Sequence, residues 1–281
     1  MRALPFKIPK PNQDALIYQV DLEVAFYDKL HQHEEIQVSL IVEGEGALIV
    51  GDSINYYTKN DVVVIGSNIP HLFKSDTTRS DSSKMITLFF TKSSFGKDFF
   101  ELEELKKLDP FFKSAKHGFK VTSNLNPIKD CFFRLEHADK LDRFLILLEV
   151  LKLCAISTHK GLSSFISNKK YTDNEGNRMR NIFEYTINNY SKEVSLKTIA
   201  EVANMTKNAF CKYFKKRTNK TYFQFLNELR IENSCKHLLE DKDTSITEIA
   251  EKVGFNNMSN FNRQFKTIKK MSPSEFRRVK Y

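Results

Sequence analysis

The strongest constraint on the fold is an internal repeat near the C-terminal end of the chain. Ser195–Glu201 reads SLKTIAE and Ser245–Glu251 reads SITEIAE, at an offset of 50 residues. After a slip of one residue the match resumes, and five residues of the first copy recur in the second: Phe210, Lys212, Phe214, Lys215 and Phe225 recur as Phe261, Arg263, Phe265, Lys266 and Phe276. This self-similarity indicates that one supersecondary unit occurs twice.

Each copy has the residue pattern of two short helices joined by a tight turn. A Ser stands where it can cap the first helix, an Ile-Ala pair gives that helix a small apolar face, and the second helix carries two Phe four residues apart. In the second copy, Gly254 permits a turn backbone that a β-branched residue would resist. The pattern predicts a helix-turn-helix, whose second helix fits the major groove of DNA.

The net charge lies in the same part of the chain. Residues 169–281 hold 23 Lys and Arg against 13 Asp and Glu, a net of +10, whereas residues 1–168 hold 21 against 22, a net of −1. A basic module joined to a neutral one is the distribution expected of a polyanion-binding domain, although a basic solvated surface gives the same count. Duplicated units that share all of the positive charge favour DNA binding over a plain helical bundle.

The duplicated region resembles the AraC/XylS family of bacterial transcription regulators. The resemblance is clearest in RIENSCKHLLEDKDTSITEIAEKVGFNNMSNFNRQFKTIKKMSPSEFR, Arg230 to Arg277, where the Ile-Ala, Gly-Phe, Phe-x-Arg-x-Phe-Lys and Ser-Pro elements stand in register. It implies two recognition helices that enter successive major-groove segments on one face of the duplex, roughly 34 Å apart.

The resemblance, carried over by position, implies which side chains contact DNA. Base edges are expected to meet Asn208, Cys211, Lys212, Met258, Ser259, Asn262 and Arg263. Arg263 suits a bidentate contact with guanine, and Asn262 or Asn208 suits one with adenine. Met258 suits a thymine methyl group. Phosphates are expected to meet Thr206, Lys207, Asn257, Lys266 and Ser272, each of which is otherwise an ordinary solvated surface residue.

The chain departs from the family pattern at two turns. The family usually has Gly after each recognition helix, whereas Asn219 and Lys270 stand there in this chain. Asn tolerates a left-handed backbone, but Lys costs about 1 kcal/mol or more in that conformation. We therefore expect the local geometry after the second recognition helix to be altered.

The remaining pattern predicts a multidomain α+β protein. Short apolar runs from Tyr18 to Phe90 predict a small barrel or sandwich of antiparallel strands in residues 1–92. Residues 93–159 are predicted to be helical, with one helix that Asp109-Pro110 ends and a buried apolar helix that packs on the barrel, on a partner subunit or on both. Residues 160–177 are predicted to be a linker, and residues 178–281 an all-α DNA-binding domain.

Residues 31–73 resemble a cupin barrel of the kind fused to many AraC-type regulators. His31, His33 and His71 fall where cupins place metal-binding imidazoles, with Glu35 as a possible carboxylate partner. Catalytic cupins place a Glu further along, where this chain has Gln37 and Val38. We therefore expect no metal and no cofactor. The expected site is a hydrogen-bonded barrel mouth that lines an effector pocket formed by His31, His33, Glu35, His71, Tyr18, Phe26 and Phe73.

These predictions describe a DNA-binding regulator controlled by a small molecule, not an enzyme. A cytoplasmic protein is expected, because no apolar run is long enough for a signal peptide or a membrane span and the four Cys show no CxxC pair. The helices between roughly 125 and 158 are expected to mediate self-association as a homodimer. The competing hypothesis is a metal-dependent cupin enzyme with a basic tail. Stoichiometric metal together with turnover of a small oxygenated substrate would favour the enzyme.

Overall fold

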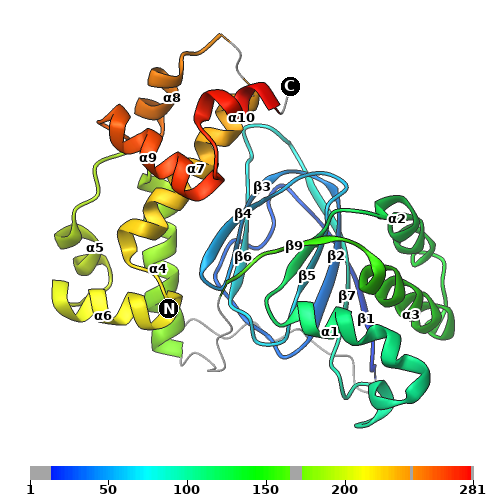
Figure 1. Ribbon diagram of the computed structural model, residues 1–281. Coiled ribbons are helices and arrows are strands. Elements are labelled where there is room, and N and C mark those ends of the chain that lie inside the picture. The colour runs from blue at the N-terminus through cyan, green and yellow to red at the C-terminus, as the bar shows by residue number, and fades with distance from the viewer. Residues whose placement is uncertain (1–13, 165–172, 241–242, 280–281) are drawn as a thin grey trace. The chain divides into compact units, whose positions relative to one another are not determined.

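The chain folds into two compact units, Met1–Gly176 and Asn177–Tyr281, in a computed structural model that describes residues 14–164, 173–240 and 243–279 (Figure 1). The first contains antiparallel sheets followed by helices, and the second is helical, so the α+β fold class predicted from the sequence is confirmed. No helix within the described ranges is long and apolar enough to cross a membrane.

The N-terminal unit is built on two antiparallel sheets. The larger sheet has the order β1-β7-β2-β5-β8-β9 and the smaller has the order β4-β3-β6. The strands are β1 (Ile17–Glu23), β2 (Ile36–Glu43), β3 (Gly46–Val50), β4 (Ser53–Tyr57), β5 (Val62–Ile65), β6 (His71–Ser75), β7 (Ser83–Phe90), β8 (Phe119–Val121) and β9 (His159–Gly161).

The period-2 alternation of the strands divides the larger sheet into two apolar faces. Ile41 and Val63 face the smaller sheet, where they pack with Leu48 and other buried residues of β3, β4 and β6. Val38 and Val62 face the other way and pack against the helices. Both faces are covered, which is why β2 and β5 are apolar almost throughout instead of alternating with polar residues.

The helices between residues 93 and 159 cover one face of the larger sheet. They are η1 (Phe99–Glu101), η2 (Glu103–Leu108), α1 (Asp109–Ala115), α2 (Leu125–Arg134) and α3 (Lys140–Ile156). The 3-10 helix η2 does end directly before Asp109-Pro110, but the chain stays helical there, because Pro110 lies in the first turn of α1. Its missing N–H and fixed φ suit that position, so the same residue that stops one helix also starts another.

Two short strands lie in segments that the sequence did not predict to be strands. β8 pairs with β5 inside the predicted helical region, and β9 pairs with β8. Residues 162–164, assigned to the linker from their composition, are bonded to the sheets. Asp52 accepts hydrogen bonds from Ser163 Oγ at 2.7 Å and from Ser164 N at 3.0 Å, and Asn55 donates to the Leu162 carbonyl at 2.8 Å.

The C-terminal unit consists of helices whose boundaries follow the predicted ones closely. They are α4 (Asp173–Asn189), α5 (Leu196–Val202), α6 (Lys207–Thr218), α7 (Tyr222–Glu240), α8 (Ile246–Lys252), α9 (Met258–Lys269) and α10 (Pro273–Val279). The pairs α5–α6 and α8–α9 are the two copies of the repeat, and α7 separates them in sequence.

Candidate nucleic-acid interface and ligand pocket

The first helix of each copy is capped as the repeat predicts. The Ser195 hydroxyl accepts a hydrogen bond from Thr198 N at 3.0 Å, and the Ser245 hydroxyl accepts one from Glu248 N at 3.1 Å. The Glu248 carboxylate in turn accepts a hydrogen bond from Ser245 N at 2.8 Å, which completes a capping box. The two Ser therefore fix where each helix-turn-helix begins.

The two turns share one hydrogen-bond pattern. Met205 N donates to Ala200 O in the first copy, and Phe255 N donates to Ala250 O in the second, both at 2.9 Å. The turn residue with positive φ is Asn204 in the first copy, at 51°, and Gly254 in the second, at 93°. The duplication seen in the sequence is therefore also a duplication of backbone geometry.

Both second helices end in a left-handed residue. Asn219 has φ 54° and Lys270 has φ 62°, and each amide donates to the carbonyl four residues earlier at 2.9 Å. Lys270 thus takes the backbone of the family's usual glycine, so the helix ending itself is not altered. Compared with a glycine at this position, Lys270 is expected to add backbone strain without changing the geometry of the helix end.

The paired aromatic residues of α6 and α9 face the interior. Phe210 and Phe214 are fully buried, and so are Phe261 and Phe265. Because an α-helix repeats every 3.6 residues, the intervening positions lie on the opposite face. Those positions are related by an offset of 51 residues: Asn208, Cys211, Lys212 and Lys215 on α6, and Ser259, Asn262, Arg263 and Lys266 on α9. All eight are exposed.

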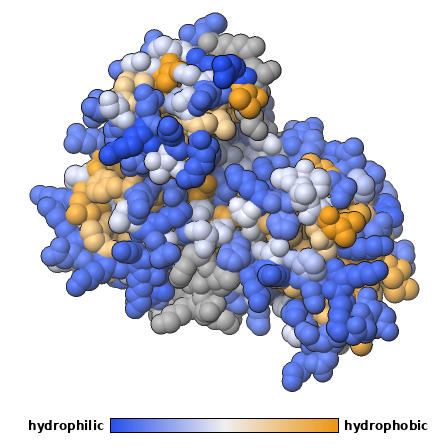
Figure 2. Space-filling model, in the orientation of Figure 1, coloured by the Kyte–Doolittle hydropathy of each residue, from blue (hydrophilic) through white to orange (hydrophobic). Residues whose placement is uncertain are grey.

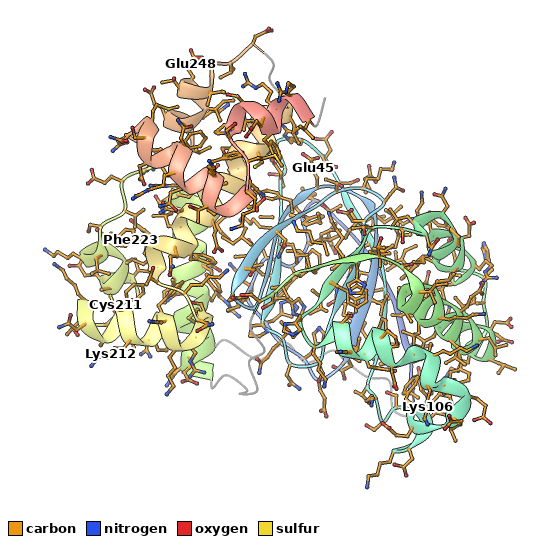
Figure 3. The ribbon with its side chains drawn as sticks, in the orientation of Figure 1. Glu45, Lys106, Cys211, Lys212, Phe223 and Glu248 are labelled. Carbon is orange, nitrogen blue, oxygen red and sulfur yellow. The ribbon has the colours of Figure 1, made fainter. Side chains whose placement is uncertain are left out.

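These exposed faces contain the predicted base-contacting residues. Cys211 and Lys212 project from α6 (Figure 3). Met258, at the start of α9, is half-buried against the core of the second copy. Arg263 Nη2 donates to Asn260 Oδ1 at 3.0 Å, so its side chain is held near the N-terminal half of α9. The structure brings the predicted residues of each copy onto one face of one helix.

Charge is separated between the two helices of each copy. α6 carries five basic residues and no acidic one, and α9 carries three basic residues and no acidic one. The acidic residues lie on the first helices, as Glu201 on α5 and Glu248 and Glu251 on α8. The exposed faces of α6 and α9 are therefore the positive surfaces of these copies, which suits a polyanion.

The predicted phosphate contacts differ in how their polar atoms are already used. Lys207 and Lys266 are exposed. Thr206 and Asn257 cap α6 and α9 through their side-chain oxygens, which leaves the hydroxyl hydrogen and the amide N–H₂ for donation. Ser272 donates both its N–H and its O–H to the Glu275 carboxylate, at 2.7 and 2.8 Å. Ser272 therefore has no donor left over for a phosphate in this arrangement.

Arg230 is a positioning residue that sequence reasoning missed. It lies on α7, and its guanidinium donates to the Tyr190 carbonyl at 2.7 Å and to the Lys192 carbonyl at 2.8 Å. It also lies over the Phe255 ring, 5.6 Å from the centroid. Burial lowers its pKa. Arg230 thus connects the segment entering the first copy to the turn of the second, and helps to fix their relative geometry.

The N-terminal unit contains a cavity of about 310 Å³ beside the larger sheet. Of the predicted effector-pocket residues, His31, Phe26 and Phe73 line it. The other lining residues are Gln19, Asp21, Glu23, Ala25, Tyr27, Gln37, Met85 and Phe89. The cavity therefore combines aromatic walls with two carboxylates and two amides.

Tyr18 does not belong to this cavity, so its assignment from the sequence is corrected. It pairs with Leu88, and both face the helices, while the neighbouring Gln19 faces the cavity. Arg143 of α3 lies over the Tyr18 ring, 4.4 Å from the centroid. A strand's side chains alternate in direction, so a one-position error moves a residue to the other face.

The remaining predicted pocket residues lie close behind His31. His33, Glu35 and His71 are buried, and the His31, His33 and His71 rings form one cluster.

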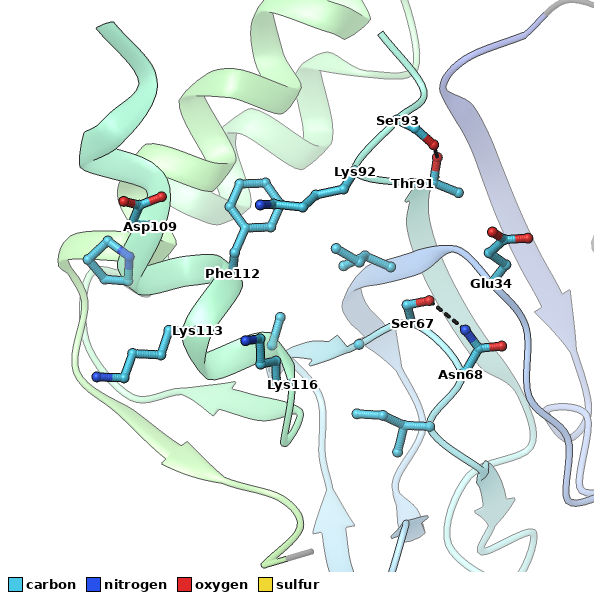
Figure 4. Close-up of a pocket in the computed structure, with 15 residues that line it drawn as sticks. Glu34, Ser67, Asn68, Thr91, Lys92, Ser93, Asp109, Phe112, Lys113 and Lys116 are labelled. Carbon is cyan, nitrogen blue, oxygen red and sulfur yellow. Dashed lines mark hydrogen bonds between the residues drawn. The ribbon is translucent and has the colours of Figure 1, made fainter. Parts of the chain in front are cut away.

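A larger cavity of about 1200 Å³ lies elsewhere in the unit, lined by loop residues and α1 (Figure 4). Lys92, Lys113 and Lys116 line it, with Lys92 Nζ 5.3 Å from the Phe112 ring centroid, but none of the predicted pocket residues does.

Comparison with known proteins places the repeat in a described domain family. Residues 199–279 match the helix-turn-helix domain. The uncharacterized HTH-type transcriptional regulator YdeC of Bacillus subtilis is 28% identical over 105 residues, which cover 37% of this chain and 36% of that protein. An uncharacterized HTH-type transcriptional regulator from the cgkA 5′ region of Pseudoalteromonas carrageenovora is 36% identical over 101 residues, which cover 36% and 59%. Both alignments span less than two thirds of the relative.

One similarity extends across both units of the chain. The Msm operon regulatory protein of Streptococcus mutans is 24% identical over 242 residues, which cover 86% of this chain and 83% of that protein. The C-terminal unit is thus a helix-turn-helix domain, and its combination with an N-terminal unit has a counterpart in a regulatory protein.

Proposed function

We propose that this chain, whose C-terminal unit is a helix-turn-helix domain of the AraC/XylS type, is a sequence-specific transcription regulator that reads DNA with α6 and α9. The observation that carries the proposal is the duplication of an exposed, acid-free, basic helix face after two turns that share one hydrogen-bond pattern. A plain helical bundle has no reason to repeat basic residues at equivalent exposed positions, as Lys212 and Arg263 do, in addition to its buried ones.

Base reading is assigned to the exposed faces of the two helices. On α9, Arg263 presents a guanidinium for the O6 and N7 atoms of guanine, and Asn262 presents an amide for adenine. On α6, Lys212 has the position that corresponds to Arg263 and Cys211 the position that corresponds to Asn262, and Asn208 lies one turn earlier. The half-buried Met258 and the exposed Ser259 complete the set at the start of α9. Thr206, Lys207, Asn257 and Lys266 are assigned to phosphates, which fix the register.

Control by a small effector is assigned to the 310 Å³ cavity of the N-terminal unit. Its polar lining consists of two carboxylates, two amides, a tyrosine and an imidazole, and no Lys or Arg of the described residues lines it. This lining favours a neutral hydroxylated ligand or a cation over an anion. The ligand can change DNA binding only through a difference in its affinity for two arrangements of the protein.

Self-association is assigned to the helical region that covers the larger sheet. α3 buries Leu147, Val150 and Leu151 against the sheet but leaves Leu141 and Leu145 exposed by 65% and 53%. Figure 2 shows hydrophobic side chains reaching the surface over the part of the molecule where α2 and α3 lie. A second copy of the chain is the proposed partner of this face. Leu145→Glu should lower the dimer fraction in analytical ultracentrifugation, while Leu102→Glu, at an exposed leucine between η1 and η2, should not.

The experiment that tests DNA reading uses the full chain. Duplexes selected from a random pool would be titrated by fluorescence anisotropy against excess random competitor at moderate salt. The double variant Lys212→Ala/Arg263→Ala should lose preference for the selected duplex. The matched variant Lys106→Ala/Lys107→Ala, which removes two exposed lysines from η2, should keep it. Selection of no preferred sequence, or equal losses in both variants, would contradict the proposal.

An effector is tested separately on the selected duplex. Candidate polyols and amines would be added to the titration, and a change in affinity or footprint would support the assigned cavity. Unchanged binding with every candidate would count against sensing while leaving DNA reading intact.

A further inference from the structure

The chain leaves the sheets of the N-terminal unit through three residues, Leu162–Ser164, which we name the anchor. They follow β9 directly and precede residues 165–172, after which α4 begins. Leu162 and Ser163 are buried, although their composition placed them in the predicted linker. The anchor is therefore fixed to the sheets and is not part of a solvated connection.

Several polar contacts of the anchor converge on the carboxylate of Asp52. This residue lies in the turn between β3 and β4 and is fully buried. Its Oδ1 atom accepts hydrogen bonds from Ser163 Oγ at 2.7 Å, from Ser164 N at 3.0 Å and from Ser53 Oγ at 3.0 Å. Its Oδ2 atom accepts one from Ser164 Oγ. A buried carboxylate needs donors in place of water, so Asp52 and the anchor stabilise each other.

Leu162 is held by its backbone and by its side chain. Its carbonyl accepts a hydrogen bond from Asn55 Nδ2 at 2.8 Å, and its amide donates to the Gly118 carbonyl at 3.0 Å. Its side chain belongs to the same buried apolar cluster as Phe26 and Phe73. Both of these aromatic residues line the 310 Å³ cavity. The anchor and one wall of the cavity therefore share one core.

A second connection between the cavity and the anchor runs through the smaller sheet. β6 carries Phe73 and pairs with β3 along its whole length. Just before Asp52, the amide of Gly51 donates to the carbonyl of Pro70 at 2.8 Å, directly ahead of β6. A displacement of β6 at the cavity therefore also acts on the turn that carries Asp52.

We propose that Asp52 is a positioning residue that holds the anchor, and that release of the anchor lengthens the connection to the DNA-binding unit. With the anchor bound, residues 165–172 connect it to α4; with the anchor released, residues 162–172 connect β9 to α4. Because an extended residue spans about 3.4 Å, three released residues add roughly 10 Å of reach. A ligand that displaces Phe26 or Phe73 shifts the anchor toward release. This last step rests on the proposed effector function, whereas the anchor itself does not.

The first test measures the distance between the two units of the full chain by double electron–electron resonance. Cys211 is the exposed cysteine among the four, so a spin label on it reports on the C-terminal unit. Glu103→Cys on η2 adds a label to the N-terminal unit, and dilution with unlabelled protein removes distances between chains. Asp52→Ala should broaden the distance distribution and extend it by up to about 10 Å. An unchanged distribution would overturn the proposal.

Control variants separate release of the anchor from a general loss of stability. Asp52→Asn keeps a carbonyl oxygen that can accept from the anchor, so it should restore part of the original distribution. Asp76→Ala removes a carboxylate that accepts from Thr78 N and Oγ1 after β6, at 3.2 and 2.6 Å, and should leave the distribution unchanged. If circular dichroism shows that Asp52→Ala does not fold, Ser163→Ala/Ser164→Ala removes the two hydroxyl donors and should give the same broadening.

The second test measures hydrogen exchange in peptides that cover the anchor. Asp52→Ala should speed exchange there by about tenfold or more, because the amide of Ser164 loses its acceptor. Phe73→Leu, in the cavity wall, should speed it as well, whereas Phe132→Leu, in the apolar cluster on the other face of the larger sheet, should not. Equal exchange in the two Phe variants would overturn the connection to the cavity. Neither test uses DNA, so a failure of DNA reading is distinguished from a failure of the anchor.

Discussion

The two helix-turn-helix copies share their buried residues and turn bonds but differ in their exposed faces. α6 carries Lys207, Lys212 and a basic run at its C-terminal end, while α9 pairs one of its three basic residues, Lys269, with Glu232 at 2.5 Å. The second copy instead presents the amide of Asn262 and the hydrogen-bonded guanidinium of Arg263. Both faces keep a basic residue at two equivalent places, Lys212 and Lys215 on α6 and Arg263 and Lys266 on α9, but α6 has Cys211 where α9 has Asn262. The shared buried residues and turn bonds thus account for the common fold of the two copies, and their different exposed side chains are the ones that can distinguish DNA sequences.

The turns show a second difference between the copies. A Cβ added at Gly254 would lie 2.7 Å from the Tyr190 carbonyl oxygen and 2.9 Å from that of Ser191. The first copy has Asn204 at the equivalent place, with an ordinary left-handed φ of 51°. The second turn therefore packs against the segment that enters the first copy, and only glycine fits there.

The largest expected effect comes from filling the second turn. Gly254→Val should lower the free energy of unfolding of the C-terminal unit by about 3 kcal/mol or more, because it combines a backbone clash with a β-branched residue at φ 93°. Asn204→Gly in the first turn should change it by only a few tenths of a kcal/mol. Urea unfolding of both variants measures the difference. Equal effects would show that the two turns are equivalent after all.

The next effect should come from the residue that connects the copies. Arg230→Met keeps much of the volume but removes the hydrogen bonds to the Tyr190 and Lys192 carbonyls, at a cost of about 2–3 kcal/mol. DNA affinity should fall as well, although Arg230 is not assigned to DNA. Arg230→Lys, which keeps the charge but not the two-pronged contact, should lie in between. A loss of affinity without any loss of stability would instead make Arg230 a DNA contact.

A smaller effect should separate bases from phosphates on α9. Arg263→Ala should cost about 1–3 kcal/mol on the preferred duplex and relax the preference at one base pair. Lys266→Ala should weaken all duplexes alike and lower the salt slope by about one. Titrations at several salt concentrations, on the preferred duplex and on single-base variants of it, distinguish the two. Equal losses across sequences for both variants would show that Arg263 is wrongly assigned.

Sequence reasoning succeeded where a local signal fixed the structure. Helix caps such as Ser195 and Ser245, and the spacing of the buried Phe, determine α5–α6 and α8–α9 without help from the rest of the chain. β8 and β9 have only three residues each and form through partners distant in sequence, so no local pattern marks them. Tyr18 was placed on the wrong face because strand register depends on a partner strand.

The candidate sites were predictable to different degrees for the same reason. The exposed faces of α6 and α9 follow from helical periodicity, and the three histidines were singled out by their spacing. The role of Arg230 was not visible, because its partners are backbone carbonyls 38 and 40 residues away, which have no sequence signature. The bonds between Asp52 and the anchor likewise appear only once the backbone is known.

The smallest expected effect concerns the residues that end the two recognition helices. Lys270→Gly should raise the free energy of unfolding by about 1 kcal/mol, because a lysine at φ 62° pays a steric cost that glycine does not. Asn219→Gly should gain less, since Asn tolerates a left-handed backbone. Chemical denaturation of the two variants compares the copies at equivalent positions. Neither exposed residue is assigned to DNA, so affinity at moderate salt should change little; a clear loss in Lys270→Gly would add the Lys270 ammonium to the phosphate-contacting groups.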